Sequence, residues 1–302
     1  MPFMGYKSVK HPNNYFIKIS IYTALALLAF AANSVLCRMA LGDKTIDASS
    51  FTIIRLLSGA IVLTIILKIK NKSKQAKTKG NWYSSIMLFL YAITFSFAYI
   101  TLDTGTGALI LFGAVQITMI LLSIYAGNRL HILEWMGLII AFTGFIYLIL
   151  PGVNIPSIRG FLLMAIAGIA WGIYTLNGRK SKNPLMDTAY NFIRTIPFLI
   201  ILLIISISQV NYSTEGIWLA IISGGVTSGI GYTIWYMALG GLSATQAAVV
   251  QLLVPVIAAF GGVIFIAEKI TFRLTMASFL ILGGILVIVM TRKKVLKTIV
   301  KK

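Results

Sequence analysis

The stretch "SFTIIRLLSGAIVLTIILKI", residues 50–69, decides the fold class of this chain. It is apolar apart from small hydroxyl residues, one arginine, and one lysine near its end. A helix of about 20 residues is about 30 Å long, which matches the hydrocarbon core of a bilayer. Similar runs recur throughout the 302 residues, of which 58% are apolar and 11% charged. A soluble domain has about 25% charged residues, so the sequence predicts an all-α integral membrane protein.

Polar, glycine and proline breaks divide the apolar runs into ten expected membrane-spanning helices. We expect them at residues 17–40, 48–69, 82–101, 105–126, 133–150, 160–177, 188–208, 217–239, 245–267 and 273–291. The connections are short, which leaves no room for a soluble domain on either side of the membrane. A polar N-terminal segment (1–16) and a basic tail (292–302) complete the chain.

The Lys and Arg residues gather in the loops of one side of this bundle. Alternating the sides places nineteen of the 26 Lys and Arg residues on one side and five on the other. Because cytoplasmic loops are enriched in Lys and Arg, we expect both termini in the cytoplasm and the basic loops against anionic lipid. The loops account for the formal charge of +19, and no aromatic residues are interleaved with them, so nucleic acid is not an expected partner.

Two halves of the chain contain similar segments at a nearly constant offset. Arg55 in "FTIIR" corresponds to Arg194 in "YNFIR", and Tyr99 in "FAYITL" corresponds to Tyr236 in "IWYMAL". Each half holds five expected helices, an odd number, so the second half should enter the membrane in the opposite orientation. Inverted repeats of this kind are typical of secondary transporters, whose substrate site lies where the repeats meet.

Residues 241–271, "GLSATQAAVVQLLVPVIAAFGGVIFIAEKIT", resemble the most recognisable stretch of bacterial EamA-type members of the drug/metabolite transporter superfamily. Residues 102–137 resemble the same element in an earlier copy, and "NSVLCRMAL" (33–41) resembles the opening of the family. The resemblance implies ten helices in two inverted five-helix repeats, here 17–150 and 160–291, around a central cavity. It also implies export of small metabolites, often amino acids, across the bacterial inner membrane.

The acidic residues avoid the centres of the expected spans. All seven lie in expected loops or at helix ends. Because proton relays use intramembrane Asp, Glu or His, this distribution favours facilitated diffusion, exchange or carbonyl-based coupling, although a helix-end carboxylate such as Glu268 can still face a cavity. With one cysteine, no phosphate-binding loop and no catalytic or metal-ligating set, we expect no enzyme activity, no cofactor and no metal.

Arg55 and Arg194 are the two cations that fall inside expected spans. Each lies about 10 Å along its helix from the nearer membrane edge, at 1.5 Å per residue. One interpretation is that each side chain snorkels to that surface or caps backbone carbonyls, and the other is that it contacts substrate. Their corresponding positions in the two halves favour a shared structural or gating role.

Amide and aromatic side chains form a second set of candidates, because they bind the carboxylate and ammonium of an amino acid without titrating. For Tyr99, Trp235 and Tyr236, near expected helix ends, the alternative is an interfacial aromatic belt. For the deeper side chains the alternative is an interhelical hydrogen bond. With the two arginines, the candidate substrate-binding residues are Asn33, Arg55, Tyr99, Gln116, Trp171, Tyr174, Asn177, Arg194, Trp235, Tyr236 and Gln251.

Prolines and glycines mark points where the spans should bend or approach one another. Pro197 and Pro255 each remove a backbone donor within an expected span, which predicts kinks. Gly225 and Gly229 lie four residues apart, and Gly262 is in the next span, so close helix contact is expected. Packing is one role for these glycines, and a hinge between two access states is the other.

Taken together, these features predict a secondary transporter that exports small metabolites, amino acids or related compounds, by alternating access. Its expected partners are a small-molecule substrate and membrane lipids. One alternative is a multidrug or toxic-compound exporter. An intramembrane acid would help that function, and the expected spans have no acid near their centres. Another is a non-transporting membrane partner protein, which does not account for the internal repeat.

Overall fold

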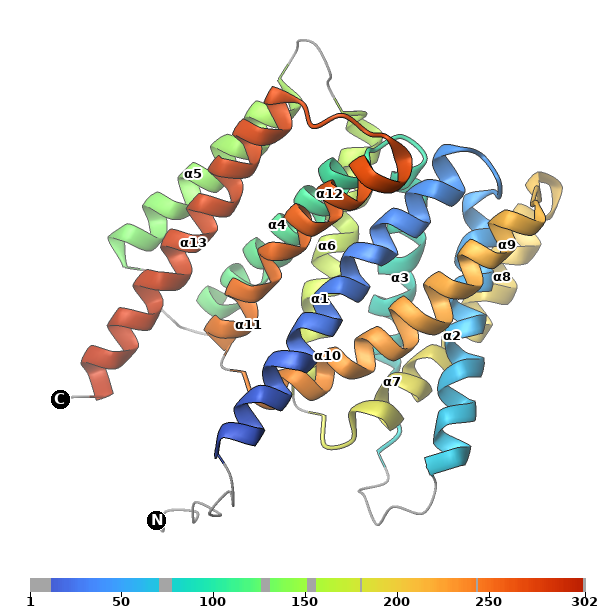
Figure 1. Cartoon of the computed structure of the whole chain (residues 1–302), viewed down its shortest axis with the longest axis horizontal. Coiled ribbons are helices and arrows are strands. Elements are labelled where there is room, and N and C mark those ends of the chain that lie inside the picture. Colours follow the sequence, from blue (N-terminus) through green and yellow to red (C-terminus); the bar gives the residue numbers. More distant parts are fainter. Residues whose placement is uncertain are drawn as a thin grey trace.

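A computed structural model describes residues 12–70, 78–125, 131–150, 156–179, 181–242 and 244–300, and these are almost entirely helical (Figure 1). Residues 1–11 of the expected N-terminal segment, 71–77 of a basic loop, and 301–302 of the tail lie outside the described residues. The elements are α1 (Pro12–Gly42), α2 (Ala48–Lys70), α3 (Trp82–Tyr99), α4 (Thr104–Tyr125), α5 (Ile132–Ile149), α6 (Ile158–Gly178), α7 (Pro184–Ile193), α8 (Ile196–Ser206), η1 (Ile207–Gln209), α9 (Thr214–Ile222), η2 (Ser223–Ile230), α10 (Gly231–Leu239), α11 (Ala244–Gln251), α12 (Leu253–Ile266) and α13 (Phe272–Val300).

Ten helical stretches of the described chain are long and apolar enough to cross a membrane. They lie at Ile17–Gly42, Ala48–Ile69, Trp82–Tyr99, Thr104–Leu122, Ile132–Ile149, Ile158–Gly178, Pro184–Gln209, Thr214–Leu239, Val249–Ile266 and Phe272–Thr291. The ten expected spans match them one for one, with small shifts at the ends. The prediction of an all-α membrane protein with ten spanning helices is confirmed.

Three of these spans are irregular inside the membrane. The seventh is divided into α7 and α8 just before Pro197, and the ninth into α11 and α12 just before Pro255. Proline cannot donate a backbone hydrogen bond and its ring clashes with the preceding turn, so both predicted kinks occur as helix breaks. The eighth span contains the π-helical segment η2 between α9 and α10.

Glycines bring the irregular spans into close contact with their neighbours. A Cβ on Gly224 of η2 would lie 1.9 Å from the carbonyl oxygen of Arg55, and one on Gly225 would lie 3.0 Å from Val62 on the same helix, α2. Close helix packing at the glycines of the eighth span is therefore confirmed.

The contacts between helices follow the internal repeat. α1 packs against α10 and α12, and α6 packs against α3 and α4, which are the corresponding helices of the other half. The last helices of the halves, α5 and α13, lie side by side at one edge of the molecule (Figure 1). A Cβ on Gly137 of α5 would lie 2.5 Å from the carbonyl oxygen of Gly284 on α13. This exchange of contacts is what two related units would produce, and their opposite orientation stays a prediction.

Candidate functional site

Arg55 of α2 lies in the interior of the bundle, with only 1% of its surface exposed. Its Nε donates to Ser228 Oγ at 3.1 Å, and its Nη2 donates to the hydroxyl oxygens of Tyr91 at 3.0 Å and Tyr232 at 2.8 Å. The guanidinium also lies over the rings of Tyr91 and Phe95, at 5.2 and 4.9 Å from their centroids. Since these partners come from α3, η2 and α10, both halves of the chain hold this one side chain.

The charge of Arg55 is held by neutral groups. Both side-chain ion pairs in the described part of the chain are made by Arg38, so Arg55 has no carboxylate partner there. Its Nη1 is buried and has no hydrogen-bond partner among the described residues. Burying an unpaired charge is costly, and hydroxyl dipoles and aromatic ring faces offset only part of that cost. Within the described chain, the interior of the bundle therefore holds a cation without an anionic partner.

Asn33 of α1 supports this arrangement from the side. Its Oδ1 accepts hydrogen bonds from Ser223 Oγ at 2.7 Å and Thr227 Oγ1 at 3.1 Å, and its Nδ2 donates to Tyr91 OH at 3.3 Å. These bonds join α1 to η2 and fix the tyrosine hydroxyl that Arg55 uses. Asn33 thus makes the interhelical hydrogen bonds that were one of its two expected roles.

Aromatic rings surround the guanidinium and its tyrosine partners. The Trp171 ring lies 5.0 Å from Tyr91 and 4.5 Å from Tyr232 between centroids. Phe30 packs edge-on against Trp171 at 5.5 Å and against Trp235 at 5.6 Å. The indole nitrogens of Trp171 and Trp235 are buried and have no hydrogen-bond partner among the described residues. We call Asn33, Arg55, Tyr91, Trp171, Tyr232 and Trp235 the central cluster.

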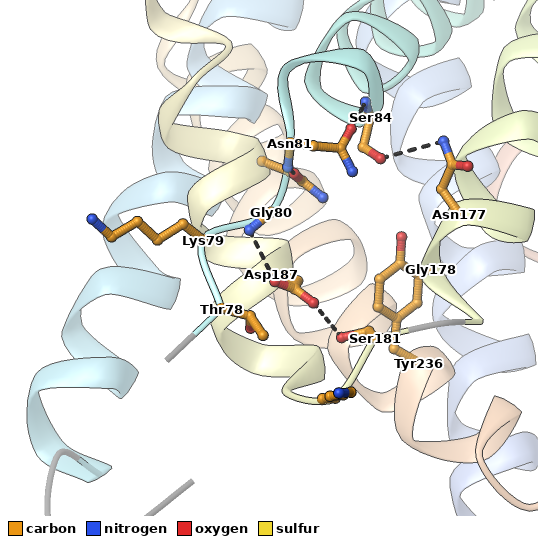
Figure 2. Close-up of a pocket in the computed structure, with 12 residues that line it drawn as sticks. Thr78, Lys79, Gly80, Asn81, Ser84, Asn177, Gly178, Ser181, Asp187 and Tyr236 are labelled. Atoms are coloured by element: carbon orange, nitrogen blue, oxygen red, sulfur yellow. Dashed lines mark hydrogen bonds between the residues drawn. The ribbon is translucent and has the colours of Figure 1, made fainter. Parts of the chain in front are cut away.

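A polar cavity of about 570 Å³ opens at the end of the bundle where α3 begins and α6 ends (Figure 2). We call it the vestibule, and its lining carries lysines, one carboxylate and several amides and hydroxyls. Its size is that of a small-molecule pocket. The residues that line it are Thr78, Lys79, Gly80, Asn81, Ser84, Asn177, Gly178, Ser181, Lys182, Asp187, Asn191 and Tyr236.

Asp187 of α7 holds the wall of the vestibule together (Figure 2). Its Oδ1 accepts from the backbone N–H of Gly80 at 2.9 Å, and its Oδ2 accepts from Ser181 Oγ at 2.5 Å. Gly80 has a left-handed φ of +58°, and a Cβ there would lie 2.3 Å from Asn191 Oδ1, so only glycine fits. Asp187 therefore connects the loop before α3, in the first half, to α7 in the second.

Two tyrosines separate the vestibule from the central cluster. Tyr236, which lines the vestibule, donates its hydroxyl to the backbone oxygen of Tyr174 at 3.3 Å, and their rings lie 5.6 Å apart. Tyr174 stacks in turn on Trp171 at 5.4 Å. A Cβ on Gly178 would lie 2.0 Å from Tyr236 Cζ, so this glycine makes room for the ring. We call Tyr174 and Tyr236 the aromatic layer, and it closes the inner end of the vestibule.

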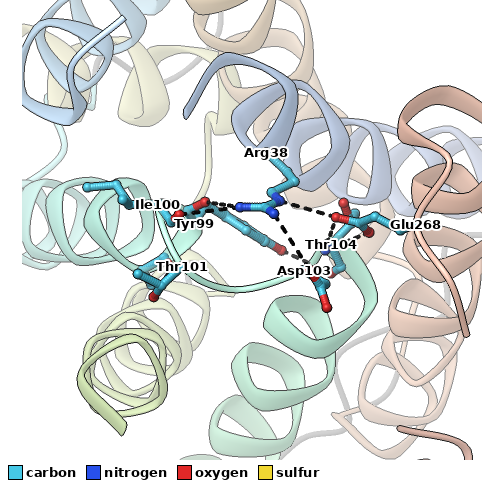
Figure 3. Close-up of polar contacts among 8 residues, drawn as sticks. Arg38, Tyr99, Ile100, Thr101, Asp103, Thr104 and Glu268 are labelled. Carbon is cyan, nitrogen blue, oxygen red and sulfur yellow. Dashed lines mark hydrogen bonds and ion pairs between the residues drawn. The ribbon is translucent and has the colours of Figure 1, made fainter. Parts of the chain in front are cut away.

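The other end of the bundle is closed by charged groups (Figure 3). Arg38 of α1 donates through Nε to Glu268 Oε1 at 3.2 Å and through Nη1 to the backbone oxygen of Tyr99 at 3.1 Å. Its Nη2 lies 3.6 Å from Asp103 Oδ1. Both oxygens of Glu268 accept from the backbone N–H of Thr104, at 3.1 and 2.9 Å. We call Arg38, Asp103, Thr104 and Glu268 the seal, and it ties α1, the start of α4 and the chain after α12 together.

The chain after α12 is shaped to present Glu268 to the seal. Ala267 has a left-handed φ of +56°, which turns the chain back at the helix end. A Cβ on Gly262 would lie 2.3 Å from Glu268 Oε2, so the carboxylate occupies space that this glycine leaves. Burial raises the pKa of Glu268, although the Thr104 and Arg38 contacts act in the opposite direction.

Arg194 does not share the environment of Arg55. It lies at the end of α7, where its Nη1 donates to the backbone oxygen of Lys79 and its guanidinium lies 5.7 Å from the Trp82 ring. Carbonyl capping near a helix end therefore describes Arg194 and does not describe Arg55, which turns inward. The two arginines have different partners because the two halves pack differently around them, and a shared structural or gating role stays a prediction.

The interfacial-belt interpretation of Tyr99, Trp235 and Tyr236 is wrong. Their exposed fractions are 0%, 0% and 4%. The ends of α3 and α10 face neighbouring helices and not lipid: a Cβ on Gly107 of α4 would lie 2.5 Å from the Tyr99 ring. Nearness to a helix end did not predict exposure because each end is covered by another helix.

The remaining candidates lie in the vestibule or at separate buried positions. Asn177 donates to Ser84 Oγ at 3.5 Å in the vestibule. Gln116 is buried in α4, and Gln251 is buried at the end of α11, where its Nε2 donates to the backbone oxygen of Ala247 at 3.1 Å. The structure thus divides the expected residues among the central cluster, the aromatic layer, the vestibule and separate buried positions.

Sequence reasoning missed three residues that the structure places in these sites, and it named a fourth, Glu268, only as a helix-end carboxylate that can face a cavity. Tyr91 and Tyr232 lie within spans and hold Arg55, and a buried tyrosine hydroxyl that needs a partner was the available signal. Arg38 was counted with the loops of one side, which concealed its contact with Glu268 across the two halves. The expected placement of the acids is confirmed for the described chain, where none lies at the centre of a span.

Comparisons with known proteins agree with this architecture. The sequence profile of the EamA-like transporter family matches residues 17–150 and again residues 158–290. An uncharacterized protein of Pseudomonas aeruginosa is 45% identical over 272 residues, which cover 90% of this chain and 94% of that one. YoaV of Bacillus subtilis, named as an uncharacterized transporter, is 22% identical over 261 residues, 82% of this chain and 89% of its own.

More distant proteins have the same overall organisation. An uncharacterized transporter of Archaeoglobus fulgidus is 26% identical over 285 residues, 90% of this chain and 95% of its own. A crystal structure with 17% sequence identity superposes with a TM-score of 0.58 over 89% of this chain and 98% of that one. At that identity the likeness concerns the fold alone.

Proposed function

Because the chain belongs to the EamA-like transporter family, we propose that it exports small metabolites, amino acids or compounds related to them, by alternating access across a bacterial inner membrane. It is a multi-pass membrane transporter, and the observation that carries the finer proposal is the difference between its two ends. One end opens into the polar vestibule, and the other is closed by the seal (Figures 2 and 3). A site reached from one side at a time is the basis of alternating access.

The chemistry of the vestibule supports an amino acid as substrate. Its lining carries positive charges on Lys79 and Lys182 and a negative charge on Asp187, together with amides and hydroxyls. A zwitterion has one carboxylate and one ammonium, so a lining with both signs attracts each group without excluding the other. Beyond the aromatic layer lies Arg55, the one buried cation among the described residues, which favours a ligand with an acidic group.

The charge distribution supports export. The vestibule lies where α3 begins, next to the basic loop that ends at Lys79, and where α6 ends, next to Arg179 and Lys182. Lysine and arginine mark the cytoplasmic side of membrane proteins, so the open end faces the cytoplasm in this proposal. Substrate then enters from the cytoplasm and leaves after the seal opens.

One observation favours the alternative of a lipophilic compound. An apolar groove of about 760 Å³ runs between α4, α11, α12 and α13, and its lining includes Pro255, Phe260 and Phe279. Phe260 and Phe279 are exposed on the outside of the bundle, where lipid would contact them. A substrate that enters from the membrane could use this groove, whereas a zwitterion could not.

Counterflow in liposomes tests the proposal. The purified protein is reconstituted in liposomes loaded with one unlabelled amino acid at a time, and uptake of the same radiolabelled amino acid is followed. We expect transient accumulation of at least one amino acid, and no accumulation in protein-free liposomes. If no amino acid accumulates while a lipophilic cation dye does, the amino acid proposal is wrong and the groove becomes the substrate path.

A further inference from the structure

We propose that Arg55 binds a carboxylate group of the transported substrate, so that the chain selects substrates by a single acidic group. This inference rests on the proposed function and names the chemistry that its central site recognises. The guanidinium is the buried charge of the central cluster, and groups from both halves of the chain surround it.

The central cluster has buried donors that lack acceptors. Arg55 Nη1, Trp171 Nε1 and Trp235 Nε1 are buried without a hydrogen-bond partner among the described residues. None of these three groups can accept a hydrogen bond, since an indole nitrogen only donates and arginine stays protonated. An unpaired buried donor is costly, so the missing partner is a group made of acceptors. A carboxylate, with two acceptor oxygens and no proton, has that character.

The charge of the site selects among anions. Arg55 contributes one positive charge, and the described residues give it only hydroxyls and ring faces as partners. One negative charge balances it, and a phosphate dianion would leave a second charge buried without a partner. The planar fork of arginine also suits the two oxygens of a carboxylate. Both tyrosine hydroxyls accept from Nη2, and the Tyr232 hydroxyl also donates to Tyr91 OH at 3.1 Å; either hydroxyl can rotate to donate to the incoming oxygens, Tyr232 in exchange for that bond.

Other arginines of the described chain show what a structural arginine does here. Arg38 donates to a carboxylate and to backbone oxygens, Arg194 to the backbone oxygen of Lys79, and Arg273 to the backbone oxygen of Leu148 at 3.3 Å. Each of these three has a carbonyl or a carboxylate as partner. Arg55 has only hydroxyls and also keeps one nitrogen unpaired, which is the arrangement of a site held ready for an acceptor.

A continuous path of side chains leads from the vestibule to Arg55. Tyr236 lines the vestibule, Tyr174 and Trp171 follow it ring against ring, and Trp171 contacts the tyrosines that hold Arg55. In the present state the aromatic layer separates the two, so binding requires these rings to part. The indole face of Trp171 then offers a surface for the apolar part of the ligand.

Thermal stability of the purified protein with paired ligands tests the proposal. The probes are the common L-amino acids, each compared with its C-terminal amide, which keeps the size and the ammonium but has no negative charge. We expect at least one acid, at about 100 times its Kd, to raise the melting temperature by about 5 °C, and its amide to leave it unchanged. Sodium phosphate and sodium acetate are run beside them to distinguish a phosphate site from a carboxylate site.

Variants locate the effect at Arg55. Arg55→Gln should abolish the shift, and Arg55→Lys, which keeps the charge but not the fork, should weaken binding about tenfold. Arg194→Gln, the corresponding arginine of the other half, should retain the shift. Because Arg55→Gln removes an unpaired buried charge, its ligand-free melting temperature should equal or exceed that of the wild type. A structural arginine would give a lower one.

Several results would overturn the proposal. The first is an amide that stabilises as well as its acid, and the second is a shift with phosphate alone. The others are no shift with any acid, and an acid-selective shift that survives in both Arg55 variants. The test is separate from that of export, because it measures binding and not flux. Acid-selective binding lost in Arg55→Gln, without any flux in liposomes, would leave the carboxylate site standing and refute export.

Discussion

The closed end of the bundle, at the seal, and the open end, at the vestibule, have different polar contacts. At the seal, one arginine is shared between two carboxylates and two backbone oxygens, and these contacts join α1, α4 and the chain after α12. At the vestibule, Asp187 is satisfied by a backbone N–H and a hydroxyl within the cavity wall, and the lysines have no ion pair among the described residues. One end is closed by ion pairs between the halves, and the other leaves its lysines to solvent or ligand.

This difference shows what the opposite access state has to change. The seal must lose its contacts between the halves, whereas the vestibule has only to narrow. Hydrogen bonds to charged groups contribute about 1.5–3 kcal/mol each, and the side chains of Arg38 and Glu268 are only 20% and 12% exposed, so solvent screens them incompletely. A few such bonds are enough to hold one state as the major population.

The largest effect is expected from removing the arginine of the seal. Arg38→Gln eliminates the contacts to Glu268 and Asp103, and loss of about 1.4 kcal/mol already raises the open population tenfold. The single cysteine, Cys37, is its neighbour in the chain and is 0% exposed, so its reaction with a membrane-impermeant maleimide reports opening without any added label site. We expect the labelling rate to rise at least about tenfold.

The matched control for this measurement is Arg273→Gln. Arg273 lies at the same end of the bundle, but its hydrogen bonds within the described part of the chain go to backbone oxygens at the end of α5 and not to a group of the seal. Its replacement should leave Cys37 protected. Equal labelling of Cys37 in Arg38→Gln and in the wild type would show that the charged contacts do not close this end.

The effect of pH on the opening of the seal should be smaller than the effect of Arg38→Gln, and we expect it to depend on Glu268. Burial raises the pKa of this carboxyl in the sealed state, whereas in an open state water would return it toward its ordinary value. The sealed state therefore binds a proton more readily, so acidification favours the seal. The charged groups near the Glu268 carboxyl are Arg38 and Asp103, and of these two only Asp103 is another carboxyl.

Cys37 labelling as a function of pH tests this sign. Thiols react more slowly in acid whatever the protein does, so the comparison is between the wild type and Glu268→Gln, which keeps an acceptor for the Thr104 N–H but cannot titrate. As the pH falls, labelling should decrease more steeply in the wild type. If the labelling rate depends on pH equally in both proteins, Glu268 does not control opening. If it falls less steeply in the wild type, acid opens the seal, which is the opposite of what we expect.

On the vestibule side, a single carboxylate change should reduce transport without opening the seal. Asp187→Asn keeps an acceptor for the Gly80 N–H but removes the one negative charge of the cavity lining. If that charge attracts the ammonium of the substrate, the apparent KM for counterflow should rise several-fold, with Cys37 still protected. An unchanged KM would assign Asp187 to the cavity wall alone.

The fold could be predicted well from the sequence because the membrane restricts it. Each stretch of about 20 apolar residues has to be a helix, since backbone groups in lipid must be satisfied within the segment. The ten spans followed from this rule, and the two breaks followed from the missing backbone donors of Pro197 and Pro255. The π-helical segment η2, whose glycines pack against α2, was not predicted.

The site could be predicted only in part, because its contacts connect residues far apart in the chain. Arg55 attracted attention as a charge in an apolar run, but its partners Tyr91 and Tyr232 look like ordinary aromatic residues of a span. The repeat suggested that Arg194 behaves like Arg55, and the structure places it on a backbone oxygen near the vestibule. A repeat in sequence predicts equivalent helices, but it does not predict equivalent side-chain partners.

The smallest effect is expected at the aromatic layer, which closes the inner end of the vestibule. Tyr236→Phe removes only the hydrogen bond to the backbone oxygen of Tyr174, which contributes about 0.5–1.5 kcal/mol, and keeps the ring that covers Gly178. Because this 3.3 Å bond is long, its contribution lies near the lower limit, and if parting of these rings limits access to Arg55, the counterflow rate should rise about twofold while Cys37 labelling stays that of the wild type. A slower rate with normal folding would instead mean that the hydroxyl itself guides the substrate inward. In either case the layer acts independently of the seal, and an increase in Cys37 labelling in this variant would show that the two are coupled.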